Sequence, residues 1–203
     1  YVLYSLTQEQ LAHTLLPLGG MSKTEVREIA RDNGFINAKK RESQDICFVP
    51  DGDYAAFIER YTGEPNRPGN FVDGEGRVLG RHRGFVRYTI GQRRGLGLSL
   101  REPLYVCAKR AADNTVILGR GEELFSKSLT ASGINLIACE RISSPLRLRA
   151  KVRYKQREQW ATVEQTAEDR LRVDFDEPQR AVTPGQAVVL YDGSCVVGGG
   201  TIE

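Results

Sequence analysis

The sequence predicts a mixed α/β and β fold, with a helical N-terminal part, a small mixed central domain and an all-β C-terminal part. Three observations predict it. Helix-capping patterns and helical spacing of apolar residues occur before residue 63, and turns rich in glycine then separate short apolar runs. From Leu129 onward, apolar and polar residues alternate with the period of two that is typical of β-strands. Several short strands separated by turns favour a small barrel.

The helices of the N-terminal part are predicted from their capping residues. The patterns at 7–10 and 22–25 combine Thr or Ser with Gln or Glu three positions later, as in a capping box. The first helix should carry Leu11 and Leu15 on one face. A third helix is predicted from Tyr54 to Tyr61, because Asp53 precedes it and Gly63 follows it.

The strands are predicted from alternation and turn signals. The runs 104–108 and 115–118 indicate a hairpin around Ala112-Asp113-Asn114. One strand alternates over ten residues, with Leu146, Leu148, Ala150, Val152 and Tyr154 on one face and Arg147, Arg149, Lys151, Arg153 and Lys155 on the other. By this parity, Tyr154 should lie in the core.

The strand with five cations is the best indication of a nucleic-acid partner, because lysine and arginine contacts to phosphate dominate such binding. A solvated strand rich in lysine and arginine is also a common way to protect a sheet edge. The net charge of +3 and the pI near 8.7 are far from strongly basic, so both interpretations stay open.

Cys47 is the candidate nucleophile. It follows a short polar stretch and the basic cluster Lys39-Lys40-Arg41, and nearby cations favour the reactive thiolate. The alternative is a small buried residue whose core neighbours are Ile46 and Phe48.

The other cysteines, the two histidines and the apolar runs give no sign of a metal site or a membrane span. Cys107, Cys139 and Cys195 each lie in apolar, strand-like segments and are expected to pack in the interior. With no C-x-x-C pair and only two histidines, no metal site is expected. No apolar run approaches the roughly 20 residues that cross a bilayer, so no membrane partner is expected. The first residues lack a basic and apolar leader, which favours a reducing cytoplasm.

Four segments, in the same order along the chain, resemble the tRNA-specific 2-thiouridylases. They are Glu42-Ser43-Gln44-Asp45-Ile46-Cys47-Phe48, Tyr88-Thr89-Ile90-Gly91-Gln92-Arg93-Arg94-Gly95-Leu96-Gly97, Val152-Arg153-Tyr154-Lys155-Gln156 and Thr183-Pro184-Gly185-Gln186-Ala187. Each motif alone is weak, but four in sequence are specific. The resemblance spans essentially the whole chain, which ends in a run of glycines, Gly198-Gly199-Gly200.

The resemblance implies three domains: a C-terminal remnant of the PP-loop catalytic domain (1–52), a central mixed domain (53–122), and a β-barrel (123–203) similar to the second domain of translation elongation factors. The family's Ser-Gly-Gly-x-Asp-Ser loop is not in these 203 residues, and the only methionine is Met21. We therefore expect the chain to be the C-terminal portion of a 2-thiouridylase, inactive alone. In the complete enzyme the resemblance implies ATP, with Mg, as cofactor.

The resemblance also implies site residues and partners. Cys47 would carry a persulfide received from a sulfur-relay protein or cysteine desulfurase and pass sulfur to C2 of a wobble uridine that ATP has activated. The family's first catalytic cysteine, which is missing from these 203 residues, would assist release, leaving a disulfide with Cys47. Contacts to tRNA are implied at Arg153, Tyr154 and Gln186. The alternative function is a non-catalytic RNA-binding barrel of the translation type.

The stretch containing Gly91, Gly95 and Gly97 matches neither a P-loop nor a dinucleotide fingerprint. We interpret it as a structural loop that requires positive φ, near the RNA or the active site, and assign it no chemistry.

Overall fold

The computed structural model describes residues 1–40, 46, 48–49 and 51–203, and they form two compact units. One unit comprises Glu9–Glu64; the other comprises Tyr1–Gln8 together with Pro65–Glu203. The helices are α1 (Gln8–Ala12), α2 (Lys23–Asp32) and α3 (Tyr54–Thr62), with a 3₁₀ turn, η1, at Val2–Ser5. The strands are β1 (Gly69–Val72), β2 (Val78–His82), β3 (Tyr105–Arg110), β4 (Thr115–Gly119), β5 (Phe125–Leu136), β6 (Leu146–Lys151), β7 (Gln159–Ala167), β8 (Arg170–Arg180), β9 (Ala187–Asp192) and β10 (Cys195–Ile202).

The helices of the 9–64 unit begin where the capping residues predict. At the start of α2, the Ser22 side chain accepts the backbone N–H of Glu25 at 3.3 Å, and the Glu25 carboxylate accepts the N–H of Ser22 at 2.6 Å. Helix α3 begins after Asp53 and ends at Gly63, whose φ of 71° is left-handed. The first helix is shorter than predicted. It ends at Ala12, and Leu15 is 90% exposed instead of sharing an apolar face.

The central sheet has the strand order β2-β1-β4-β3, with β1 and β4 parallel and the other pairs antiparallel. The predicted hairpin is confirmed as β3 and β4, and Asn114 in its turn has a left-handed φ of 51°. Phe71, Val106 and Leu118 are fully buried in the core of this sheet.

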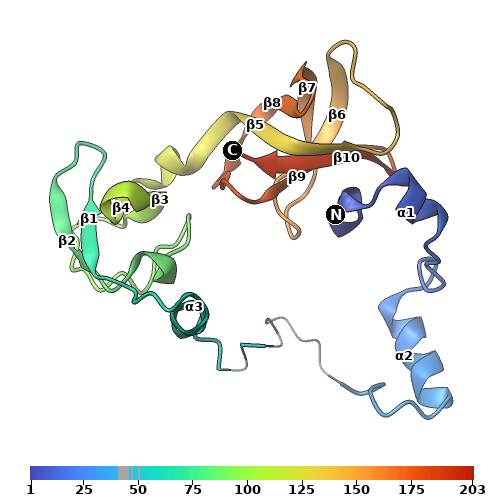
Figure 1. Ribbon diagram of the computed structural model, residues 1–203, viewed down its shortest axis with the longest axis horizontal. Coiled ribbons are helices and arrows are strands. Elements are labelled where there is room, and N and C mark those ends of the chain that lie inside the picture. Colours follow the sequence, from blue (N-terminus) through green and yellow to red (C-terminus); the bar gives the residue numbers. More distant parts are fainter. Residues whose placement is uncertain (41–45, 47, 50) are drawn as a thin grey trace. The chain divides into compact units, whose positions relative to one another are not determined.

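The C-terminal strands close into an antiparallel barrel in the order β10-β5-β8-β7-β6-β9 (Figure 1). Its interior is filled by the apolar faces of the alternating strands, including Leu148 and Ala150 of β6 and Leu171 and Val173 of β8. The mixed α/β and β fold class is therefore confirmed.

The first residues of the chain pack on the outside of the barrel, against β10 and β5 (Figure 1). The Asn135 side-chain amide donates to the carbonyl oxygens of Tyr4 and Leu6, at 2.6 and 2.8 Å. A Cβ at Gly199 would lie 2.7 Å from the Tyr4 ring, so only glycine lets the ring approach this closely. Among the helices of the described residues, none is long and apolar enough to cross a membrane.

Candidate nucleic-acid interface

One end of the barrel brings Arg153, Tyr154 and Gln186 together. Arg153 and Tyr154 follow β6, and Gln186 ends the loop 181–186 between β8 and β9. The Arg153 Nη2 donates across this end to the carbonyl oxygen of Ala181 and to the Thr183 hydroxyl, both at 3.0 Å. The segment after β6 and the loop before β9 are thereby tied to each other.

Tyr154 lies on the surface, where 71% of it is exposed. The parity argument that placed it in the core was wrong, because β6 ends at Lys151 and the alternation does not continue to residue 154. Its ring meets the Tyr1 ring edge-on at 6.2 Å between centroids, and the Lys151 Nζ lies 5.9 Å from its centroid. The ring is thus braced on one side and open on the other.

Tyr1 connects the two parts of this end of the barrel. Its hydroxyl donates to the carbonyl oxygen of Ala187, the residue after Gln186, at 2.7 Å. Burial raises the pKa of the Tyr1 hydroxyl, and the neighbouring Tyr4 and Tyr191 act in the same direction. The hydroxyl therefore stays protonated and keeps donating this hydrogen bond at neutral pH.

Gln186 is held through its backbone. Its N–H donates to Thr183 O at 3.1 Å, and its carbonyl accepts from the Ile202 N–H at 2.8 Å. The residue is exposed, and its side chain makes no hydrogen bond with the described residues. A fixed backbone with an available amide suits recognition of a polar partner.

Four of the five predicted cations divide into engaged and available ones, and the fifth, Lys155, is exposed. Arg147 forms a two-point ion pair with Asp176, at 2.8 and 2.7 Å, and Arg153 is engaged as described above. Arg149 and Lys151 have no ion pair with any described residue, and the Arg149 guanidinium lies 5.1 Å from the centroid of the half-exposed Trp160 ring. The available charge therefore lies on the β6–β7 face.

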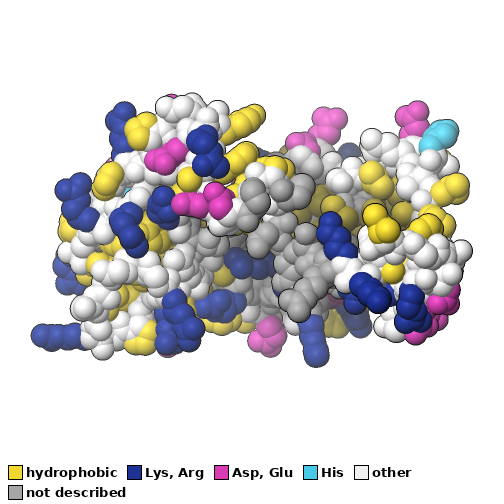
Figure 2. All heavy atoms as spheres, turned by 90° about the horizontal axis from the view of Figure 1, so that it is seen from below, with side chains coloured by type: hydrophobic (Ala, Val, Ile, Leu, Met, Phe, Trp, Pro, Cys, Tyr) yellow, Lys and Arg dark blue, Asp and Glu magenta, His cyan; other side chains and the backbone are white. Residues whose placement is uncertain are grey.

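Lysine and arginine are not confined to the barrel. Figure 2 shows them scattered among hydrophobic and acidic side chains on the face that includes the central sheet. The positive charge of the chain is thus distributed, and the local arrangement at the barrel end is more informative than the net charge.

The predicted nucleophile, Cys47, lies outside the described residues. Ile46 and Phe48, which would be its core neighbours in the alternative interpretation, are 46% and 62% exposed. The Phe48 ring packs against Phe57 of α3, with centroids 5.3 Å apart. The two described neighbours of Cys47 are therefore not core residues.

The other cysteines differ from one another. Cys107 and Cys139 are partly buried, and Cys139 packs against the barrel core, as predicted. The prediction was wrong for Cys195, which is exposed because it is the first residue of β10, next to the turn at Gly193. Burial raises the pKa of the Cys107 thiol, and the Glu123 carboxylate adds to the effect. Cys107 is therefore a poor nucleophile near neutral pH.

The glycine-rich stretch is a structural loop, as predicted. Gly91, Gly95 and Gly97 have φ values of 88°, 75° and 72°. The Gly91 N–H donates to Val106 O at 2.8 Å, and the Val106 N–H donates to Gln92 O at 2.9 Å. These backbone groups pair the loop with β3, so the Gly91 amide is not available to a phosphate.

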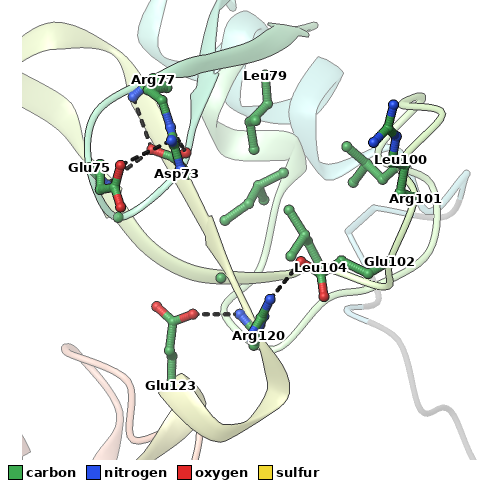
Figure 3. Close-up of a pocket in the computed structure, with 13 residues that line it drawn as sticks. Asp73, Glu75, Arg77, Leu79, Leu100, Arg101, Glu102, Leu104, Arg120 and Glu123 are labelled. Atoms are coloured by element: carbon green, nitrogen blue, oxygen red, sulfur yellow. Dashed lines mark hydrogen bonds and ion pairs between the residues drawn. The ribbon is translucent and has the colours of Figure 1, made fainter.

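A pocket of about 540 Å³ opens beside the central sheet (Figure 3). Arg77 pairs there with Asp73 at 2.7 Å and Glu75 at 3.1 Å, and Arg120 pairs with Glu102 at 3.1 Å. The hydrogen bond from Arg77 lowers the pKa of the Asp73 carboxyl. Because these charges neutralise one another and no predicted site residue lines the pocket, we assign it no ligand.

Tyr1, Thr183 and Trp160 are not among the site residues that the sequence predicts. Thr183 belongs to the motif Thr183-Pro184-Gly185-Gln186, and its hydroxyl is the one feature of the sequence that points to it. The roles of Tyr1 and Trp160 depend on cross-strand neighbours that only the fold supplies. Among the described residues, no group of three or more His, Cys, Asp or Glu side chains could hold a metal ion.

Comparisons with known proteins agree with this architecture. Three family models match in order: the tRNA methyl transferase HUP domain at residues 1–51, the tRNA methyl transferase PRC-barrel domain at 55–120, and the aminomethyltransferase beta-barrel domain at 126–202. The tRNA-specific 2-thiouridylases of Acetivibrio thermocellus and Carboxydothermus hydrogenoformans are 50% and 51% identical over 203 residues. That of Clostridioides difficile is 48% identical over 203 residues.

Each of these alignments covers 100% of this chain but 56% of the relative, so the chain spans a little over half the length of the relatives it matches. The aligned region extends over the whole of this chain. The chain therefore belongs to the tRNA-specific 2-thiouridylase family.

Proposed function

We propose that this chain is the C-terminal portion of a cytoplasmic enzyme that replaces the C2 oxygen of a tRNA wobble uridine with sulfur. The observation that supports this proposal is the identity of about half of all 203 residues to enzymes named as tRNA-specific 2-thiouridylases. The exposed aromatic and amide side chains at the barrel end support a nucleic-acid substrate independently.

Cys47 is the sulfur carrier in this proposal. A persulfide on a sulfur-relay protein or cysteine desulfurase transfers its outer sulfur to the Cys47 thiolate, and the donor leaves as a thiol. The terminal sulfur then bonds to C2 of the uridine, while the C–O bond breaks with its electron pair leaving on oxygen. A second cysteine thiolate attacks the Cys47 Sγ and releases the transferred sulfur. The resulting disulfide is reset by a thiol reductant.

ATP and its magnesium ion do not fit the described residues of this chain. The Gly91 amide is already used in pairing with β3, and the described residues hold no cluster of metal-binding side chains. We therefore assign the nucleotide to no residue here and derive no step from it.

The tRNA interface in this proposal is the barrel end formed by Arg153, Tyr154 and Gln186. The open Tyr154 ring can stack on an unstacked base, and the Gln186 amide can bond to a base edge or the backbone. Arg149 and Lys151 lie nearby on β6 with unpaired charge for phosphates. Base modification requires the uridine to leave its stack, which such an aromatic contact assists.

The test uses the full-length protein with unmodified tRNA, ATP and a persulfide donor, and measures 2-thiouridine by mass spectrometry of digested tRNA. Cys47→Ser should abolish sulfur transfer, while Cys195→Ser, which alters an exposed thiol, should retain it. If both variants thiolate tRNA equally, Cys47 is not the carrier. If the wild type binds tRNA but accepts no sulfur, the protein is instead a non-catalytic RNA-binding module.

A further inference from the structure

Ala181 is the most constrained residue of the barrel end. It has a left-handed φ of 56°, which alanine rarely adopts, and only 3% of it is exposed. Its N–H donates to Leu124 O at 2.7 Å, and its carbonyl accepts both from Arg153 Nη2 at 3.0 Å and from the Thr183 hydroxyl at 2.8 Å. These bonds hold a backbone conformation that is unfavourable on its own.

The Arg153 guanidinium is directed into the protein. Its Nη2 makes both hydrogen bonds to the 181–186 loop, and its buried Nε has no hydrogen-bond partner among the described residues. Nearby, the Gln156 amide donates to the Gln179 side chain at 2.7 Å, and Gln179 is 4% exposed. Two side chains of the segment after β6, Arg153 and Gln156, therefore bond to side chains or backbone of residues 179–183.

We propose that Arg153 is a positioning residue that holds the 181–186 loop, and through it Gln186, in the shape that binds tRNA. This inference rests on the proposed function and changes the role of Arg153 within it: the guanidinium acts through the loop and not by neutralising a phosphate. Thr183 shares this role, because its hydroxyl bonds to the Ala181 carbonyl and accepts from Arg153.

A positioning role and a phosphate contact differ in their response to salt and to lysine. Each phosphate contact contributes roughly 0.7–0.9 to the slope of log K against log salt. A positioning residue contributes nothing to that slope. Lysine can replace a point charge at a phosphate, but its compact, strongly hydrated ammonium on a flexible stem does not reproduce the fixed position of the Arg153 Nη2, which makes both bonds to Ala181 and Thr183.

The experiment measures the tRNA affinity of the full-length protein from about 50 to 200 mM salt, because affinity that depends on phosphate contacts falls steeply over this range. The variants are R153K, R153A, T183V, Q186A and the double variant R153A/Q186A, with K155A as a control for an exposed cation. We expect R153K and R153A to lose affinity to the same extent, about 5- to 30-fold, with an unchanged salt slope. T183V should also weaken tRNA binding. The double variant R153A/Q186A should bind tRNA only slightly more weakly than Q186A alone.

Two outcomes overturn the proposal: wild-type affinity in R153K together with a reduced salt slope in R153A, or losses from R153A and Q186A that simply add. Hydrogen exchange without tRNA provides a separate readout, because R153K and T183V should accelerate exchange of the Ala181 and Gln186 amides. Unchanged exchange also overturns the positioning role. If the wild type does not bind tRNA, but R153K and T183V still accelerate exchange of the Ala181 and Gln186 amides, the proposed function fails and the loop-holding role of Arg153 stands.

Discussion

Tyr154 offers a direct way to separate a core side chain from a recognition side chain. Period-two parity placed it in the barrel interior, but the structure leaves it 71% exposed beyond the end of β6. Replacing it with alanine should therefore affect stability and tRNA binding in different proportions from a core substitution.

The structure sets the expected magnitudes. Tyr154→Ala removes one edge-to-face contact with Tyr1, worth about 0.5–1.5 kcal/mol. It also removes an exposed cation–π contact with Lys151, worth about 0.5–1 kcal/mol. The free energy of unfolding should thus fall by no more than about 2.5 kcal/mol, whereas a buried aromatic costs about 3–5 kcal/mol when truncated. Loss of one stacked base would weaken tRNA binding by about 1–3 kcal/mol, or roughly 5- to 160-fold.

The assay combines urea unfolding of the full-length protein with titration of fluorescent tRNA. Leu148→Ala is the matched control, because Leu148 lies on the core face of β6, the strand that precedes Tyr154, and is 5% exposed. It should cost about 2–5 kcal/mol of stability, with the tRNA affinity of the folded fraction preserved. Tyr154→Phe keeps the ring and should bind nearly as well as the wild type. A loss of 3 kcal/mol or more in Tyr154→Ala, with tRNA affinity intact, would refute the reasoning.

Two further predictions concern the surface charge and the thiols. Arg149→Ala should lower the salt slope of tRNA binding by about 0.7–0.9, whereas Arg147→Ala should lower it by less than half as much, because Arg147 is already paired with a carboxylate. An unchanged slope in Arg149→Ala would show that Arg149 does not contact a phosphate. For the thiols, burial raises the pKa of Cys107, so its thiolate forms at higher pH, and iodoacetamide should label it more slowly than Cys195 at pH 8. Peptide mass spectrometry over a pH series tests this order, and faster labelling of Cys107 would contradict it.

Much of the secondary structure could be predicted because its signals are local. The capping box at Ser22 and Glu25 forms as expected, and α3 runs between its predicted cap at Asp53 and Gly63. The first helix was overestimated, because Leu15 has helical spacing but no partner to bury it. Spacing alone does not stabilise a short helix in water.

The sequence by itself determined the features that depend on local patterns. These are the alternating strands of the barrel, the positive-φ glycine loop, and the motifs that resemble those of the thiouridylase family. It could not determine which cations are available, because Arg147 of β6 meets its carboxylate on β8, beyond the intervening strand β7, and Arg153 bonds to Ala181, 28 residues further on. Tyr154 was misplaced for a related reason, since a strand ends where its cross-strand partners end. Pairing between distant segments decides which side chains are buried, and that pairing exists only in the tertiary structure.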